Sequence, residues 1–205
     1  MSFSENGFEV VRSYLCKQTM DLLKYEYHTL LDLLHINDTY REHSIKFPTG
    51  QILTCFNWYS PLFTESLSKL IQNKVQEIVQ KELFPTYSMV RTYKTGDELY
   101  KHSDRPSCQF SVTLPILTSI NWPIYITDRK GIDRIIYLNE GDILIYDGFL
   151  EHWREKYEGD EHTQCFMHWV DANGKYKYLK YDGRIGLSLP PVPLTKDNVD
   201  FFNKH

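Results

Sequence analysis

Apolar residues in the first part of the chain recur at helical intervals. Between residues 8 and 34 they fall mostly three or four positions apart, which predicts one or two helices. A second apolar stripe runs from residue 63 to residue 79 and includes Leu70. The preceding Ser60-Pro61 supplies a cap and a proline at the first helical position. We expect this second helix to end before Pro85 and to pack its stripe against a sheet.

Beyond Pro85 the apolar residues alternate with polar ones, most plainly between residues 108 and 114. A period of two is typical of strands with one buried face, and turn signals such as Asn139-Glu140-Gly141 separate the alternating segments. Eight short strands within about 85 residues predict a jelly roll or a small barrel, so the expected fold class is α+β and mainly β. The expected strands are Tyr87–Tyr93, Glu98–Ser103, Cys108–Ile116, Pro123–Thr127, Asp133–Leu138, Asp142–Tyr146, Glu151–Tyr157 and His162–Asp171.

The length of 205 residues corresponds to a single domain. We divide it into helical support over residues 1–85, a jelly-roll core over residues 86–171 and a C-terminal tail over residues 172–205 that wraps the core. Aromatic residues make up 15% of the chain, which favours strands and the walls of a binding pocket. We expect about half of the strand aromatics to face inward and the rest to pack beneath the helices.

The charge balance narrows the classes of partner. The chain has 23 Lys and Arg against 27 Asp and Glu and no basic run, so nucleic-acid binding is disfavoured. The first residues carry no signal-peptide pattern, and no segment is long and apolar enough to span a bilayer. We therefore expect a cytoplasmic protein without a membrane partner.

The four cysteines form no CxxC pair, which argues against a structural zinc site and favours reduced, buried thiols.

Three residues have the types and spacing of a metal site. His102 and Asp104 are separated by one position at the end of an expected strand, so their side chains leave the same face. His152 arrives from a later strand of a sheet that can close on itself. Two imidazoles and one carboxylate form a facial triad that binds Fe(II) and leaves three coordination positions open. The sequence therefore predicts an iron site made of these three side chains.

These features resemble the 2-oxoglutarate- and Fe(II)-dependent oxygenases of the prolyl-4-hydroxylase-like group. The resemblance covers residues 86–171. It rests on the segment Met89-Val90-Arg91-Thr92-Tyr93 that leads through Gly96 to His102-Ser103-Asp104, on the Gly141-Asp142 turn with its apolar strand, on His152, and on a final strand ending in His168-Trp169-Val170-Asp171. It implies a double-stranded β-helix (jelly roll) with supporting N-terminal helices. It also implies that the protein is an enzyme, a dioxygenase with the two histidines and the aspartate as iron ligands.

The resemblance further implies the reaction and its cofactors. Fe(II), the cosubstrate 2-oxoglutarate and O₂ are expected, and ascorbate is allowed. The implied hydroxylase converts 2-oxoglutarate to succinate and CO₂ while it hydroxylates an unidentified substrate, such as a protein or peptide side chain. Because Asp104 stands where related halogenases have a small residue, hydroxylation is expected rather than halogenation.

One departure from the group concerns the far carboxylate of 2-oxoglutarate. The group usually has Arg or Lys about ten residues after the second histidine, where this chain has His162. A cation is still required, because burying a carboxylate without a partner is costly. Arg154 lies two positions after His152 and points to the same interior face, and its guanidinium can bind a carboxylate through two hydrogen bonds. We rank Arg154 first and His162 second as the cosubstrate anchor. Additional hydrogen bonds to the cosubstrate are expected from Tyr93, Gln164 and Thr113.

Several of these residues have an alternative interpretation. Arg154 could form a surface ion pair with a neighbouring glutamate, and His162 could be a hydrogen-bonded core histidine. Arg105, which follows Asp104, either contacts substrate at the mouth of the site or is solvated. His168 falls on the inward face of the last strand, where it either supports the metal ligands or packs under the barrel mouth.

Two other functions compete with the oxygenase. A cupin-like barrel would bind a metal or a small ligand without oxygenase activity, and its aromatic residues would line the ligand site. Nucleic-acid dealkylation is less favoured, because the chain is acidic and lacks a pair of arginines on the strand after the second histidine.

Overall fold

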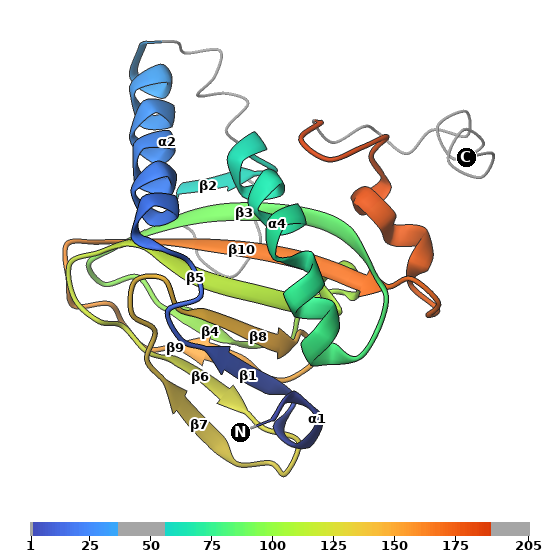
Figure 1. Cartoon of the computed structure of the whole chain (residues 1–205). Coiled ribbons are helices and arrows are strands. Elements are labelled where there is room, and N and C mark those ends of the chain that lie inside the picture. Colours follow the sequence, from blue (N-terminus) through green and yellow to red (C-terminus); the bar gives the residue numbers. More distant parts are fainter. Residues whose placement is uncertain (1, 37–55, 190–205) are drawn as a thin grey trace.

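A computed structural model describes residues 2–36 and 56–189 and consists of two facing β-sheets with helices on one side (Figure 1). The larger sheet has six strands in the order β1-β8-β5-β10-β3-β2, and every neighbouring pair is antiparallel. Its strands are β1 (Phe8–Val11), β2 (Phe56–Tyr59), β3 (Leu83–Lys94), β5 (Phe110–Thr118), β8 (Ile143–Asp147) and β10 (Glu161–Asp171).

The smaller sheet has four antiparallel strands in the order β4-β9-β6-β7. Its strands are β4 (Leu99–His102), β6 (Ile124–Thr127), β7 (Asp133–Ile136) and β9 (His152–Arg154). The chain alternates between the two sheets, so sequence neighbours such as β8 and β9 lie in different layers. This is the expected jelly roll, and each of the eight strands predicted beyond Pro85 is present within a few residues of its expected bounds.

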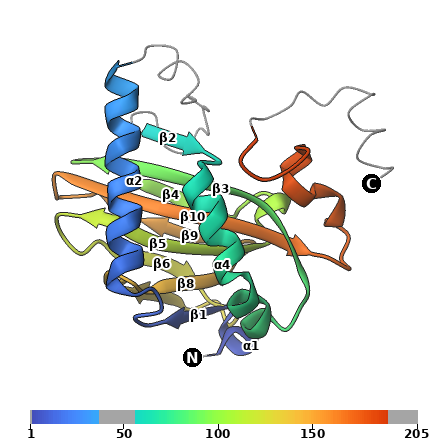
Figure 2. The ribbon, with the colours of Figure 1, turned by 45° about the horizontal axis from the view of Figure 1, so that its top comes forward.

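Two long helices cover the outer face of the six-stranded sheet (Figures 1 and 2). They are α2 (Lys17–Ile36) and α4 (Leu62–Val79), and a short helix α1 (Phe3–Asn6) precedes β1. Met20 and Leu23 of α2 and Ile71 and Val75 of α4 join a buried cluster with Val112 and other residues of the sheet. The helices cover only the outer face of this sheet, so its inner face borders the space between the two sheets.

The N-terminal part differs from the expectation in several ways. Residues 8–11 form the edge strand β1 rather than part of a helix, because they pair with β8. The helix cap is Pro61 rather than Ser60, whose φ of 55° is left-handed. Leu70 is 67% exposed, because α4 turns it away from the sheet. The helix ends at Val79, and Pro85 lies inside β3 rather than before a strand. The edge strand β2 was not predicted either.

The strand aromatics divide between three environments rather than the expected two. Tyr87, Tyr93 and Tyr146 are buried between the sheets, and Phe110 and Trp169 belong to the cluster beneath the helices. Others lie on the open face of the smaller sheet, where no helix covers them. Examples are Tyr100 and Tyr137, both of which are more than half exposed, and the stacked pair Tyr125 and Trp153.

The C-terminal segment packs back onto the core after β10. A short helical segment η2 (Lys177–Gly183) contacts β3, and the described part of the chain ends at residue 189, so the Pro190–Pro193 part of the predicted tail lies outside it. Cys16, Cys108 and Cys165 are free thiols; Cys108 and Cys165 are buried as expected, Cys16 is exposed, and Cys55 lies outside the described residues. None of the described helices is long and apolar enough to cross a membrane.

Candidate functional site

His102, Asp104 and His152 converge between the two sheets. The Asp104 Oδ1 atom lies 3.7 Å from His102 Nε2 and 3.8 Å from His152 Nε2, and the two imidazole rings are 4.4 Å apart. One ligand atom from each residue lies within 4.8 Å of the others, a spacing that one metal ion can bridge. The three side chains thus form the facial set of two nitrogens and one oxygen that suits Fe(II).

Strand pairing brings these residues together. His102 ends β4 and lies directly opposite His152 at the start of β9. Asp104 lies just beyond β4, where its N–H donates to the carbonyl of Gly148 at 2.8 Å. Gly148 leaves room for this approach, since a Cβ there would lie 1.9 Å from the Cys108 carbonyl oxygen and 3.2 Å from Asp104 Cβ. The turn between β8 and β9 therefore holds the carboxylate against the histidines.

Hydrogen bonds orient both imidazoles for metal binding. The Nδ1 atom of His102 lies 2.7 Å from the carbonyl of Tyr100, and that of His152 lies 2.9 Å from the carbonyl of Leu150. Since a carbonyl only accepts, Nδ1 carries the proton in each ring and Nε2 presents its lone pair to the site. Burial lowers the pKa of both histidines, that of His152 to about 4, so both are neutral near pH 7.

The carboxylate of Asp104 has a second set of partners on its other side. Ser111 Oγ lies 3.3 Å from Asp104 Oδ2 and 2.9 Å from Nδ1 of the buried His168. Burial raises the pKa of Asp104 to about 6, and the hydrogen bond from Ser111 opposes this shift. Asp104, Cys108 and His168 are also close enough to form a metal cluster. However, the Ser111 hydroxyl lies between Asp104 and His168, so this group supports the carboxylate through hydrogen bonds.

A cavity of about 320 Å³ opens beside the three converging residues. Its walls include the aromatic side chains of Tyr87, Tyr146 and Phe166 and the buried guanidinium of Arg91. Arg91 Nε donates to Asn57 Oδ1 at 2.5 Å, which ties β3 to β2 at this wall. Because the cavity combines apolar walls with a few polar groups, it has the character of a small-molecule site.

Arg154 lies deeper between the sheets and is only 2% exposed. Its guanidinium stacks 4.8 Å from the centroid of Trp122, and Nη1 donates to the Trp122 carbonyl. Its Nε atom has no hydrogen-bond partner, and neither does the hydroxyl of the fully buried Tyr93. Among residues 2–36 and 56–189 no carboxylate pairs with Arg154, so the surface ion pair with a neighbouring glutamate is wrong. Burial without a counter-ion lowers the pKa of Arg154 to about 10.

The other side chains expected to contact the cosubstrate already form hydrogen bonds within the protein. His162 contacts Gln164 Oε1 at 2.7 Å through Nε2 and Thr118 Oγ1 at 3.0 Å through Nδ1. The Gln164 amide donates to Thr113 Oγ1 at 2.6 Å, and this hydroxyl donates to the Cys165 carbonyl. His162 thus has the partners of a hydrogen-bonded core histidine, whereas Arg154 and Tyr93 have unsatisfied donors.

Arg105 lies at the cavity, where its side chain is 53% exposed to solvent and is also paired with a carboxylate. Its two Nη atoms donate to Asp182 at 3.0 and 2.7 Å, and its guanidinium lies 4.7 Å from the centroid of the Tyr87 ring. Its charge is therefore paired within the protein, which weakens its assignment as a substrate contact.

Sequence reasoning missed several residues of this site. Arg91 belongs to the segment that supports the resemblance and shares the inward face of β3 with Tyr93, a signal that could have found it. Ser111 is a polar residue at an inward position of a predicted strand. Nothing in the pattern singled out Gly148 or Asp182, because their partners are distant in the chain.

Comparison with solved structures identifies proteins with the same architecture. The epimerase SnoN from nogalamycin biosynthesis, a non-heme alpha ketoglutarate dependent enzyme, superposes with a TM-score of 0.68 at 13% identity over 96% of this chain and 93% of its own. EctD from S. alaskensis with bound Fe gives 0.64 at 13% identity, covering 83% and 75%. A Pseudomonas putida prolyl-4-hydroxylase gives 0.62 at 12% identity, covering 82% and 95%.

The fold is shared with these three proteins. At such low identity the similarity concerns the architecture, in which two sheets enclose the site. No protein-family profile matches the chain, and no curated protein sequence matches it either.

Proposed function

We propose that this protein is an Fe(II)- and 2-oxoglutarate-dependent oxygenase. One observation carries the proposal: the His102, Asp104 and His152 side chains converge at a cavity between the sheets, in a fold shared with structures that include EctD with bound Fe and with 2-oxoglutarate. The neutral, oriented imidazoles and the single carboxylate match the donor set of a non-heme iron site.

The buried donors supply the second part of the proposal. Arg154 and Tyr93 present an unpaired Nε–H and an unpaired hydroxyl, and no carboxylate of the described residues pairs with either group. An uncompensated buried cation is costly, so the far carboxylate of 2-oxoglutarate is a suitable counter-ion. We assign Arg154 as the anchor and Tyr93 as a second donor, while Gln164 and Thr113 orient His162 behind them.

With its metal and cosubstrate bound, such a site couples the oxidative decarboxylation of 2-oxoglutarate by O₂ to the oxidation of a substrate C–H bond. The balanced reaction consumes 2-oxoglutarate, O₂ and R–H and yields succinate, CO₂ and R–OH. Within the chain, the apolar rings of Tyr146 and Phe166 restrict water, and Asp104 and the two histidines hold three positions and leave the rest for ligands.

We assign hydroxylation because the metal-binding carboxylate is present. SnoN is described as an epimerase and SnoK, another structure with this fold, as a carbocyclase, so the fold accommodates other oxidative outcomes. The prolyl-4-hydroxylase-like subgroup and a protein or peptide substrate are parts of this proposal that rest on the resemblance alone. A cytoplasmic location rests on the pattern of the first residues and is part of the proposal as well.

The proposal is tested by anaerobic addition of Fe(II) and 2-oxoglutarate to the purified chain. We expect a visible metal-to-ligand charge-transfer band that disappears in His152→Ala. A folded protein that binds Fe(II) without giving the band would instead support a metal-binding barrel without oxygenase activity. Succinate release measured with and without candidate substrates then separates coupled from uncoupled turnover.

A further inference from the structure

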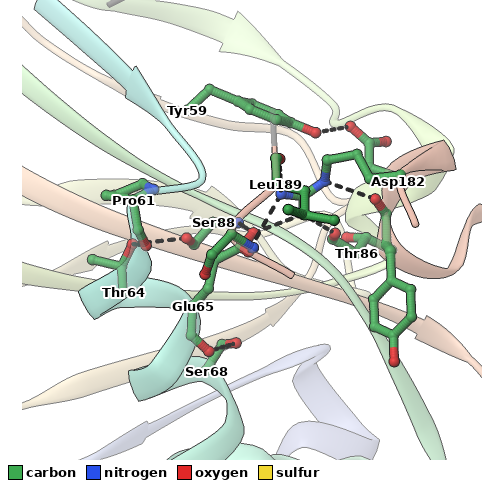
Figure 3. Close-up of polar contacts among 12 residues, drawn as sticks. Tyr59, Pro61, Thr64, Glu65, Ser68, Thr86, Ser88, Asp182 and Leu189 are labelled. Carbon is green, nitrogen blue, oxygen red and sulfur yellow. Dashed lines mark hydrogen bonds and ion pairs between the residues drawn. The ribbon is translucent and has the colours of Figure 1, made fainter. Parts of the chain in front are cut away.

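The C-terminal residues 177–189, which we call the strap, fold back against β3 beside the candidate metal site. The strap includes η2 and reaches both α4, on the outer face of the larger sheet, and the loop that carries Asp104. Figure 3 shows its contacts with Tyr59 of β2, Glu65 of α4 and Thr86 of β3. These three consecutive elements are far from the strap in the sequence. A segment with this position can couple the outside of the fold to the site.

A fully buried ion pair fixes the strap to α4. Arg184 is 0% exposed and Glu65 of α4 is 1% exposed, with 2.7 Å between Nη2 and Oε1. The guanidinium makes five hydrogen bonds, two to Glu65 and one each to the carbonyls of Tyr181, Leu189 and Thr86. Because every donor is satisfied, this pair fixes the strap in one position.

The backbone of the strap is strained where it approaches the site. Tyr181 and Asp182 are consecutive non-glycine residues with left-handed φ values of 57° and 54°, and Ser188 has a φ of 62°. Aspartate tolerates this conformation, but it is unfavourable for Tyr181 and Ser188 and persists there only where surrounding contacts impose it. Here the left-handed backbone turns the Asp182 carboxylate toward the cavity side.

The Asp182 carboxylate binds the residue that follows the metal ligand. It accepts both Nη donors of Arg105, at 3.0 and 2.7 Å, and the hydroxyl of Tyr59 at 2.6 Å. Arg105 is the residue next to Asp104, and a short helical turn, η1 (Pro106–Cys108), begins directly after it. The two-point contact therefore restrains the loop in addition to Gly148, whose carbonyl accepts the Asp104 N–H.

We propose that the strap holds the Asp104 carboxylate in its metal-binding position through the ion pair between Asp182 and Arg105. This inference rests on the proposed function, since it assigns Asp182 as a positioning residue for the metal centre. The ion pair joins positions 77 residues apart in the chain. The strap and its buried Arg184 thus help to fix the position of the Asp104 carboxylate.

The decisive variant is Asp182→Asn. Asparagine has the same shape and tolerates a left-handed backbone, so the substitution removes the charge while leaving the strap conformation accessible. We expect the dissociation constant for Co(II), measured by anaerobic equilibrium dialysis, to rise about tenfold. We also expect the visible ligand-field spectrum of the Co(II) protein to change. In the metal-free chain, amide hydrogen exchange over residues 103–108 should accelerate while that of α4 stays unchanged.

Three comparisons separate positioning from general loosening. Arg105→Gln should weaken Co(II) binding to a similar degree. The double variant should bind Co(II) as tightly as the single variant with the lower affinity, because both substitutions act through one contact. Tyr59→Phe removes the other partner of Asp182 and should have a smaller effect. Glu140→Gln, at an exposed acid paired with Lys24, should match the parent.

Parent-like Co(II) affinity and parent-like exchange over residues 103–108 in Asp182→Asn would overturn the proposal. A parent chain that binds Co(II) but gives no charge-transfer band with Fe(II) and 2-oxoglutarate would overturn the proposed function alone, because the strap effect is measured on Co(II). A parent chain that binds no Co(II) would overturn both.

Discussion

Gly148 lies so close to Cys108 that a Cβ at position 148 would be 1.9 Å from the Cys108 carbonyl oxygen. The same glycine accepts the Asp104 N–H through its carbonyl and donates its own N–H to Gln109 at 3.0 Å. The turn after β8 and the loop after β4 are therefore in direct backbone contact at the metal-binding carboxylate. Any side chain at position 148 must push these two segments apart.

Gly148→Ala should consequently damage the site more than the fold. We expect a loss of about 1–3 kcal/mol in the free energy of unfolding, typical of overpacking, and at least tenfold weaker Co(II) binding because Asp104 is displaced. Gly131→Asn is the matched control, since an added Cβ there meets no atom within 4 Å and asparagine tolerates the left-handed φ of 75°. Chemical denaturation and equilibrium dialysis measure the two effects. Unchanged Co(II) affinity in Gly148→Ala would contradict this account of the carboxylate.

Arg154→Met should change cosubstrate affinity and stability in opposite directions. Losing the buried partner of a carboxylate costs about 2–5 kcal/mol, which corresponds to roughly 30-fold or weaker binding of 2-oxoglutarate. In the absence of 2-oxoglutarate, removal of an unpaired buried cation should raise the melting temperature. Isothermal titration of the Co(II) protein and thermal unfolding measure these effects. Equal 2-oxoglutarate affinity in the parent and the variant would rule out Arg154 as the anchor.

Ser111→Ala removes the hydroxyl that links His168 to Asp104. The carboxylate then loses a hydrogen bond and its orientation, so we expect about tenfold weaker Co(II) binding with little change in 2-oxoglutarate affinity at saturating metal. Ser66→Ala on α4 is the control, because that exposed hydroxyl only bonds its own helix. If both variants bind Co(II) like the parent, the link through Ser111 has no role in metal binding.

His162 should make stability depend on pH. Burial, with the nearby Arg154 charge, lowers the pKa of His162 to about 3, below the ordinary histidine value of about 6.5. The unfolded chain therefore binds a proton that the folded chain does not, and stability falls as the pH drops from about 6.5 toward 3. The contribution is about 1.4 kcal/mol per pH unit in that window.

His162→Gln should reduce the slope of unfolding free energy against pH by about one proton in this window. Urea denaturation at several pH values between 4 and 7 provides the measurement. Ser66→Ala, at an exposed position of α4, changes no titratable group and is the control for this measurement. An identical slope for the parent and His162→Gln would mean that His162 is protonated in the folded protein.

Local pattern was sufficient for much of the fold. The twofold alternation beyond Pro85 predicted all eight later strands, because a strand with one buried face carries its periodicity in adjacent residues. The spacing of His102 and Asp104 likewise placed both side chains on one face. The twofold alternation did not reveal β1 and β2, which lie before Pro85 and are defined by their pairing at the two edges of the larger sheet.

By itself, the sequence determined the jelly-roll class and the residue types of the candidate metal site. Tertiary structure decided which side chains keep unsatisfied donors, as at Arg154 and Tyr93, and which are already paired, as at His162 and Arg105. It also brought Asp182 to the loop of the metal ligand. Burial and hydrogen-bond satisfaction are properties of atoms that meet across the fold, and no periodicity along the chain encodes them.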